Sequence, residues 1–97
     1  MNCYMIVIAE ITDRQRFLEG YAREVPKLVE RFGGRYIVKG GGGDFLENGW
    51  CDRPSALVSQ WPDKASALAF WNSPEYAQAK KLREGVGRFQ VTLIEAP

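Results

Sequence analysis

The order of the apolar segments along the chain limits the folds that it can adopt. Four segments of β-strand character alternate with two stretches of helical periodicity, in the order strand, helix, strand, strand, helix, strand. The expected strands cover residues 4–10, 35–40, 55–61 and 88–96, and the expected helices lie between residues 13 and 33 and between residues 63 and 85. This order predicts a ferredoxin-like α+β domain, βαββαβ, in which a four-stranded antiparallel sheet carries both helices on one face.

The first helical segment carries signals for where it begins and ends. Asp13 has the side chain expected of an N-cap, and Gly33 and Gly34 are expected to end the helix in a left-handed conformation. We expect Pro26 to kink or restart the helix, because proline lacks the backbone N–H that the helix needs. The apolar stripe on one helical face is Phe17, Tyr21, Leu28 and Phe32.

The second helical segment is marked in the same way. Asp63 is its expected N-cap, and Ser73, Pro74 and Glu75 together predict a new helix start. Gly85 is expected to end this segment.

The first expected strand is apolar on both sides. One face would carry Tyr4, Ile6 and Ile8, and the other would carry Met5, Val7 and Ala9. In an antiparallel sheet with one solvated face, one of these two sets would be polar. Two helices cover only one face, and small soluble monomers rarely expose a large apolar patch. We therefore expect a twofold homodimer in which the open sheet faces of two copies meet.

Four consecutive glycines, Gly40 to Gly43, follow the second expected strand. A dinucleotide-binding fingerprint would place such glycines at the start of a helix, and a P-loop would add Gly-Lys-Ser/Thr; neither pattern is present. The Glu-Asn-Gly sequence that comes next is typical of a hairpin turn. We therefore expect the glycines to form a bulged or flexible hairpin, and the alternative that they form the rim of a pocket stays open.

Composition excludes several classes of function. A chain of 97 residues is expected to form one domain over residues 1–97. Its net charge of +1 offers no strong field for nucleic acid or for an anionic membrane. Histidine is absent, which excludes His-based nucleophilic triads, haem ligation by His and His-based metal sites. We expect no metal and no cofactor.

Other features narrow the expected partners and location. The third expected strand lacks the basic-Gly-aromatic consensus of RNA-recognition motifs, which share this order of elements. Two cysteines, Cys3 and Cys51, are too few for a disulfide framework. The N-terminal apolar run has no positively charged flank, and no segment reaches the roughly 20 apolar residues of a membrane span. We expect a soluble, cytoplasmic protein.

Two segments of the chain resemble a known family. "FGGRYIVKGG" (residues 32–41) and "FWNSPEYAQAKKLREG" (residues 70–85) are similar to the small bacterial proteins that share domain of unknown function 1330. The similarity extends over nearly the whole chain. It implies the fold of the dimeric α/β-barrel superfamily and a homodimer. It implies no established reaction, because that superfamily includes cofactor-free monooxygenases, isomerases of ring-cleavage pathways, haem enzymes and proteins without known activity.

The candidate ligand-binding residues are aromatic or cationic. Tyr76 and Arg83 share one helical face, so a phenol and a guanidinium are expected to point together at an anionic ligand. Arg35, at the start of the second strand, is a third candidate, and Trp71 and Tyr21 are candidate aromatic walls. A purely structural role stays open for each of them, because large aromatic residues dominate cores and surface arginines often form ion pairs.

Two classes of function remain open, and the sequence identifies no catalytic residue. One is a homodimer that binds, or also transforms, a small anionic organic molecule in a pocket between sheet and helices. The other is a non-catalytic homodimer with an interaction or stress-related role. An acid/base pair among Asp44, Glu47 and Asp52 and a reactive Cys51 are weaker options, because polar loops are common and a neighbouring carboxylate disfavours a thiolate.

Overall fold

One antiparallel sheet and one layer of helices make up the part of the chain that the computed structural model describes, residues 2–97. The elements are β1 (Asn2–Ile11), α1 (Arg14–Glu19), α2 (Tyr21–Arg31), β2 (Arg35–Gly40), β3 (Ser55–Trp61), α3 (Lys64–Trp71), α4 (Pro74–Lys80), the 3-10 helix η1 (Lys81–Arg83) and β4 (Gly87–Ala96). The sheet order is β2-β3-β1-β4, and all neighbours are antiparallel. The ferredoxin-like α+β fold expected from the sequence is confirmed.

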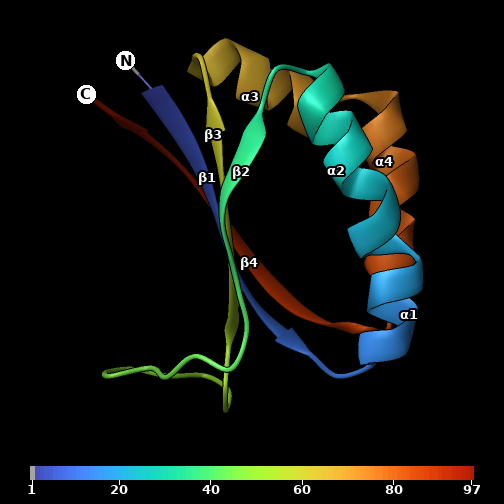
Figure 1. Cartoon of the computed structure of the whole chain (residues 1–97), viewed down its shortest axis with the longest axis vertical. Coiled ribbons are helices and arrows are strands. Elements are labelled where there is room, and N and C mark those ends of the chain that lie inside the picture. The colour runs from blue at the N-terminus through green and yellow to red at the C-terminus, as the bar shows by residue number, and fades with distance from the viewer. Residues whose placement is uncertain (1) are drawn as a thin grey trace.

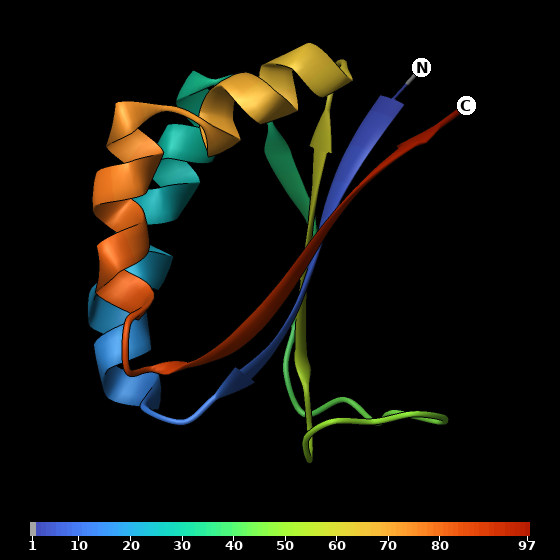
Figure 2. The same ribbon diagram turned by 180° about the vertical axis from the view of Figure 1, so that it is seen from behind.

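The helices all lie on the same side of the sheet, as Figures 1 and 2 show from opposite directions. The core fills the space between the two layers. Cys3, Met5 and Ala9 of β1 point into it and are buried, together with Trp61 from β3 and Phe70 from α3. No helix within residues 2–97 is long and apolar enough to cross a membrane.

The expected helix signals are confirmed at most positions. Asp13 and Asp63 each accept a hydrogen bond from the backbone N–H three residues on, at 3.2 and 2.7 Å. Gly33 has a φ of 93°, so α2 ends in the left-handed conformation that glycine adopts without steric cost. These local signals place the helices correctly because each cap satisfies backbone groups that the helix itself leaves unpaired.

The helix does not restart at Pro26, as one of the two expectations for this residue had it. Pro26 lies inside α2, and the interruption between α1 and α2 occurs at Gly20, whose φ and ψ of −110° and −89° are not helical. The missing N–H of Pro26 removes one backbone hydrogen bond, but its neighbours Val25 and Val29 are buried against the sheet. Packing of this face therefore keeps the helix intact through the proline.

The expected hairpin is present, because β2 pairs with β3 as its antiparallel neighbour, but the connection between the two strands is long. Residues 41–54, which we call the arm, contain no helix or strand and project from the end of the sheet on the side away from the helices (Figures 1 and 2). The irregularity in β2 lies earlier than the glycines: the pairing with β3 shifts between Tyr36 and Val38, so Ile37 is the extra residue of a bulge.

The face of the sheet without helices is apolar at its centre. We call it the open face. The register of the four strands places on it the side chains of Tyr4, Ile6, Ile8, Val38, Val58 and Ile94. Val38 and Ile94 are exposed, with 46% and 45% of their surface accessible. The two-sided apolar character expected of the first strand is therefore present in the structure.

Candidate ligand-binding cavity

A half-enclosed cavity of about 380 Å³ lies between the helices α1 and α2 and the strands β2 and β3. Apolar and aromatic side chains form most of its wall. The lining residues are Ile11, Arg14, Phe17, Leu18, Tyr21, Ala22, Val25, Pro26, Tyr36, Lys39, Gly40, Gly41, Ser55 and Leu57. This volume falls in the range of about 300–1,000 Å³ that is usual for sites of small organic ligands.

The helical wall of the cavity follows from the spacing of its residues. Phe17, Tyr21 and Val25 are four positions apart and therefore project from one side of α1 and α2. The rings of Phe17 and Tyr21 stack with centroids 5.8 Å apart. The break at Gly20 falls between them and changes the direction of the chain without removing either ring from the cavity.

The bulge at Ile37 shapes the wall that the sheet provides. In a regular strand, Tyr36 and Lys39 would point to opposite faces, because side chains alternate. The bulge pairs Tyr36 with Ser59 and Lys39 with Leu57, so both side chains point toward the helices. The Lys39 ammonium lies 5.0 Å from the centre of the Tyr36 ring. One extra residue in β2 therefore brings a cation into the cavity wall.

The charges around the cavity have one sign. Arg14 and Lys39 are the cations in its wall, and none of the described residues that line it is Asp or Glu. Burial, with a smaller contribution from Tyr76, raises the pKa of Tyr36 to about 12, so this phenol is neutral at physiological pH. The cavity thus combines apolar walls with two positively charged side chains, which favour a ligand with a negative group.

A hydrogen-bonded pair of tyrosines lies behind this cavity. The hydroxyl oxygens of Tyr21 and Tyr76 are 2.8 Å apart, and the two residues are 7% and 1% exposed. Burial raises the pKa of both phenols, and for Tyr21 the nearby Tyr76 adds to the effect. A small void of about 20 Å³ adjoins the pair and also borders Tyr36 and Trp71, with room for one water molecule. Tyr21 lines both hollows.

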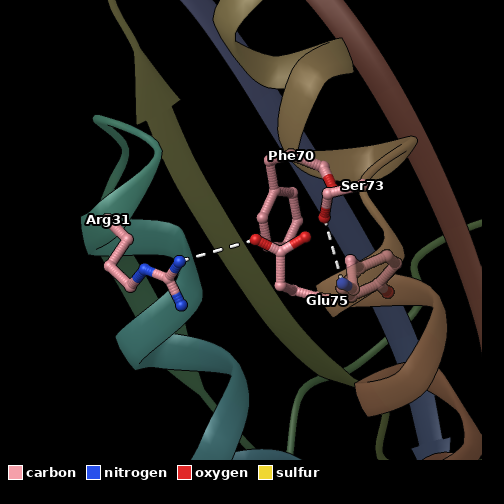
Figure 3. A network of polar contacts seen from close by, with 5 residues as sticks. Arg31, Phe70, Ser73 and Glu75 are labelled. Atoms are coloured by element: carbon pink, nitrogen blue, oxygen red, sulfur yellow. Dashed lines mark hydrogen bonds and ion pairs between the residues drawn. The ribbon is translucent and has the colours of Figure 1, made fainter.

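Ser73 and the start of α4 fix the position of Tyr76. Ser73 Oγ accepts a hydrogen bond from the Tyr76 N–H at 3.0 Å and donates one to the Phe70 carbonyl at 2.7 Å (Figure 3). Arg31 of α2 and Glu75 of α4 form an ion pair at 3.4 Å, also drawn in Figure 3. The cap holds the start of α4 to the end of α3, and the exposed ion pair connects α2 and α4, the two helices that carry the tyrosine pair.

Arg83 lies close to Tyr21 but outside the cavity wall. Its guanidinium stacks over the Phe89 ring at 4.7 Å and lies 5.9 Å from the centre of the Tyr21 ring. Its Nη1 atom is buried and has no hydrogen-bond partner among residues 2–97. A second, more open hollow adjoins Arg83 between η1 and β4, where Lys80 and Lys81 add positive charge.

The structure brings four of the five candidate residues together. Tyr21 lines the cavity; Tyr76 and Trp71 pack behind it with ring centroids 5.1 Å apart, and Arg83 lies beside the Tyr21 ring. Arg35 is distant from them: it is exposed at the start of β2 and donates a hydrogen bond to Gln60 Oε1 at 3.0 Å.

Tyr21 is the one lining residue among the candidates from the sequence, and the residues that sequence reasoning missed include Arg14, Lys39 and Tyr36. The bulge determines that Lys39 and Tyr36 face the same side of the sheet, and no glycine or proline in the sequence marks its position. Arg14 directly follows the N-cap Asp13, and a residue at this position is usually on the solvent-exposed surface of a helix, so the sequence does not mark it as part of a site.

The residues of the weaker options, Asp44, Glu47, Cys51 and Asp52, all line one open hollow of the arm, whose wall has little apolar surface. Asp44, Glu47 and Asp52 are exposed in the arm, and residues 2–97 contain no group of three Cys, Asp or Glu side chains that could hold a metal ion. Desolvation and the Glu10 carboxylate raise the pKa of the Cys51 thiol, which is the opposite of what an activated thiolate needs.

The fold and the cavity define the chain as a ferredoxin-like domain with a ligand-sized space between its helices and its sheet. The model of the family described as a domain of unknown function (DUF1330) matches residues 2–97. The chain therefore belongs to this family, as the two sequence segments indicated. No protein with a curated description matches the sequence at a significant level.

Solved structures share the fold at low sequence identity. A protein of unknown function from Rhodopseudomonas palustris is 15% identical, with a TM-score of 0.80 over 99% of this chain and 82% of its own. A dimeric ferredoxin-like protein of unknown function from Jannaschia sp. CCS1 is 18% identical, with a TM-score of 0.73 over 99% and 100%. SnoaB, a cofactor-independent oxygenase from Streptomyces nogalater, is 11% identical, with a TM-score of 0.71 over 99% and 93%. These likenesses show the fold alone.

Proposed function

We propose that this protein is a homodimer that binds a small organic molecule with a negatively charged group in the cavity between α1, α2 and the β2–β3 edge of the sheet. The observation that carries the proposal is the wall of the cavity, which is largely apolar and holds two cations, Arg14 and Lys39, with no carboxylate among its described residues. Arg14 and Lys39 are also exposed to solvent, and a carboxylate bound in the cavity would accept charge-assisted hydrogen bonds from them that a neutral apolar ligand could not.

The candidate residues divide into two roles in this proposal. Tyr21 contacts the ligand directly, because its ring is part of the cavity wall. Tyr76, Trp71 and Arg83 hold the Tyr21 ring in position through the hydroxyl pair, the packing behind it and the stacked guanidinium. Arg35 lies at the other end of β2 and takes no part in this cavity.

The homodimer forms through the open face. The apolar side chains on that face support this dimer, because Val38 and Ile94 are about half exposed and small soluble monomers rarely expose a large apolar patch. A structure of the same fold, from Jannaschia sp. CCS1, is described as dimeric. Because a twofold axis brings identical patches together, a second copy matches an apolar patch with an apolar patch.

No reaction is included in the proposal. The cavity wall contains two neutral phenols, Tyr21 and Tyr36, and two cations, which serve to bind and orient a ligand. The likeness to an oxygenase, at 11% identity, is a likeness of fold.

A thermal-shift screen with matched pairs of carboxylates and carboxamides tests the ligand class. Each pair, such as phenylacetate and phenylacetamide or octanoate and octanamide, has nearly the same shape and differs in charge. We expect the melting temperature to rise with some carboxylates and to stay constant with their amides, because a ligand stabilises the state that binds it. Equal shifts with both members of every pair, or no shift with any compound, would contradict the proposed ligand class.

A further inference from the structure

The arm carries apolar side chains to the side of the sheet where the open face lies. It projects away from the helices, as both views of the ribbon show (Figures 1 and 2). Phe45, Leu46 and Trp50 belong to it, and Leu46 is 94% exposed. Leucine is among the residues most often buried in proteins. A leucine presented in this way is suited to contact another molecule.

The arm is fastened to the sheet by Arg88. The Nη2 atom of Arg88 donates a hydrogen bond to the Trp50 carbonyl at 2.8 Å, and the guanidinium lies 4.9 Å from the centre of the Trp50 ring. Arg88 Nε also donates to Glu10 Oε1 at 2.9 Å, which connects the arm to β4 and β1. Phe45 packs on Trp50 with ring centroids 5.9 Å apart. Leu46 is therefore next to an anchored aromatic pair.

The base of the arm is closed by a tight backbone contact. The Gly43 N–H donates a hydrogen bond to the Pro54 carbonyl at 2.9 Å, and Gly42 has a φ of 67°. A Cβ atom at Gly42 would lie 2.7 Å from Nη2 of Arg53. Gly42 thus has a conformation that glycine adopts without steric cost, near the point where the arm leaves the sheet.

We propose that the arm is a clasp for a second copy of this chain. A copy seated on the open face meets the arm as a side wall, because arm and open face lie on the same side of the sheet. Twofold symmetry makes the contact reciprocal, so each dimer buries two copies of Leu46. This inference rests on the homodimer of the proposed function. It adds that the arm contributes to the affinity and selectivity with which two copies of the chain associate.

The charges of the arm agree with a second copy as its partner. Asp44, Glu47 and Asp52 outnumber Arg53, the one cation within residues 41–54. Arg35 and Tyr4 both pair with Gln60 of β3, so the Arg35 side chain lies on the open face together with that of Tyr4. Arg35 forms no ion pair within residues 2–97. A second copy thus presents on its open face a guanidinium whose charge is opposite to that of the arm, which favours this partner electrostatically.

Sedimentation of the full chain over a series of concentrations tests the clasp. Leu46→Ser is the test variant, and Leu68→Ser is its matched control, since Leu68 is 37% exposed on α3, on the opposite side of the sheet. We expect the parent and Leu68→Ser to dimerise alike. Leu46→Ser should dimerise with a dissociation constant at least about 10-fold higher, because two leucines lose their burial in each dimer.

A second variant keeps the test decisive if Leu46→Ser changes the arm itself. Arg35→Glu should also raise the dissociation constant, and the effect should shrink at high salt, while Arg23→Glu on the exposed surface of α2 should leave it unchanged. A monomeric parent would overturn both the homodimer and the clasp. A dimeric parent whose affinity is unchanged in both Leu46→Ser and Arg35→Glu would overturn the clasp alone.

Discussion

The hydroxyl groups of Tyr21 and Tyr76 are each other's hydrogen-bond partner at 2.8 Å, across the contact between α2 and α4. Tyr76 belongs to the centre of the core, whereas the ring of Tyr21 is also part of the cavity wall. The pair therefore links the stability of the core to the shape of the cavity. Variants that lack one hydroxyl or both test this link.

Removing one hydroxyl should cost more stability than removing the second. Tyr21→Phe or Tyr76→Phe leaves the other hydroxyl buried without its partner, at a cost of about 1–3 kcal/mol in the free energy of unfolding. The double variant removes both polar groups and should be less unstable than the sum of the single variants. Urea unfolding of the parent, the two single variants and the double variant measures how far the loss in the double variant falls below that sum. Strictly additive losses would mean that the two hydroxyls do not depend on each other.

Stability should fall at alkaline pH. Burial raises the pKa of Tyr36 to about 12, and it also raises the pKa of Tyr21 and Tyr76, against an ordinary value of 10.0. Between pH 10 and 12 the unfolded chain loses these protons and the folded chain keeps them, so the free energy of unfolding decreases as pH rises.

Tyr36→Phe supplies the control for the alkaline effect. This variant has one phenol fewer to ionise on unfolding, so its loss of stability above pH 10 should be shallower than that of the parent. Urea unfolding at pH 8, 10 and 11 measures both slopes. A parent protein whose free energy of unfolding is constant over this range would show that the phenols ionise equally in the folded and unfolded states.

The fold could be predicted from the sequence because its signals are local. Apolar and β-branched residues mark the first strand and alternation marks the last one. Asp13, Asp63 and Ser73 mark helix starts by pairing with nearby backbone groups. Pro26 was misjudged because packing of the α2 face, which no local rule contains, outweighs one lost hydrogen bond.

The candidate site could be predicted only in part. Tyr21, Tyr76, Trp71 and Arg83 come from strong helical patterns and do lie together. Lys39 faces the cavity because of a bulge that becomes visible only when β2 pairs with β3. Register between strands is a long-range property, and a single extra residue reverses which face each later side chain occupies.

The arm should be sensitive to substitution at one glycine and tolerant at another. Gly42→Ala places a side chain at a φ of 67° and within 2.7 Å of Arg53, which should cost about 1 kcal/mol or more in stability or dimer affinity. Gly40→Ala is the matched control for stability and dimer affinity, because no atom lies within 4 Å of its added Cβ; Gly40 lines the cavity, so it does not serve as a control for ligand binding. Thermal unfolding and sedimentation compare the two. If Gly42→Ala affected ligand binding alone, the glycines would act as a pocket rim instead.

Arg83 should affect ligand affinity more than stability. Arg83→Met loses the stacking on Phe89 but also removes a buried Nη1 atom that has no partner within residues 2–97, so the two effects should nearly cancel, to within about 1 kcal/mol. The Tyr21 ring loses its support, and the expected order of affinity is parent, then Arg83→Lys, then Arg83→Met. An Arg83→Met protein that is unstable but binds the ligand normally would make Arg83 a purely structural residue.

Calorimetric titration of Lys39→Met with the best matched carboxylate and carboxamide tests the central proposal most directly. Lys27→Met is the control, because Lys27 is an exposed residue of α2 outside the cavity wall. We expect the parent and Lys27→Met to prefer the carboxylate, and Lys39→Met to lose roughly 0.5–1 kcal/mol of that preference, which is about 2- to 5-fold in the dissociation constant, because Lys39 is exposed to solvent. An unchanged preference in Lys39→Met would contradict an anion site in this cavity.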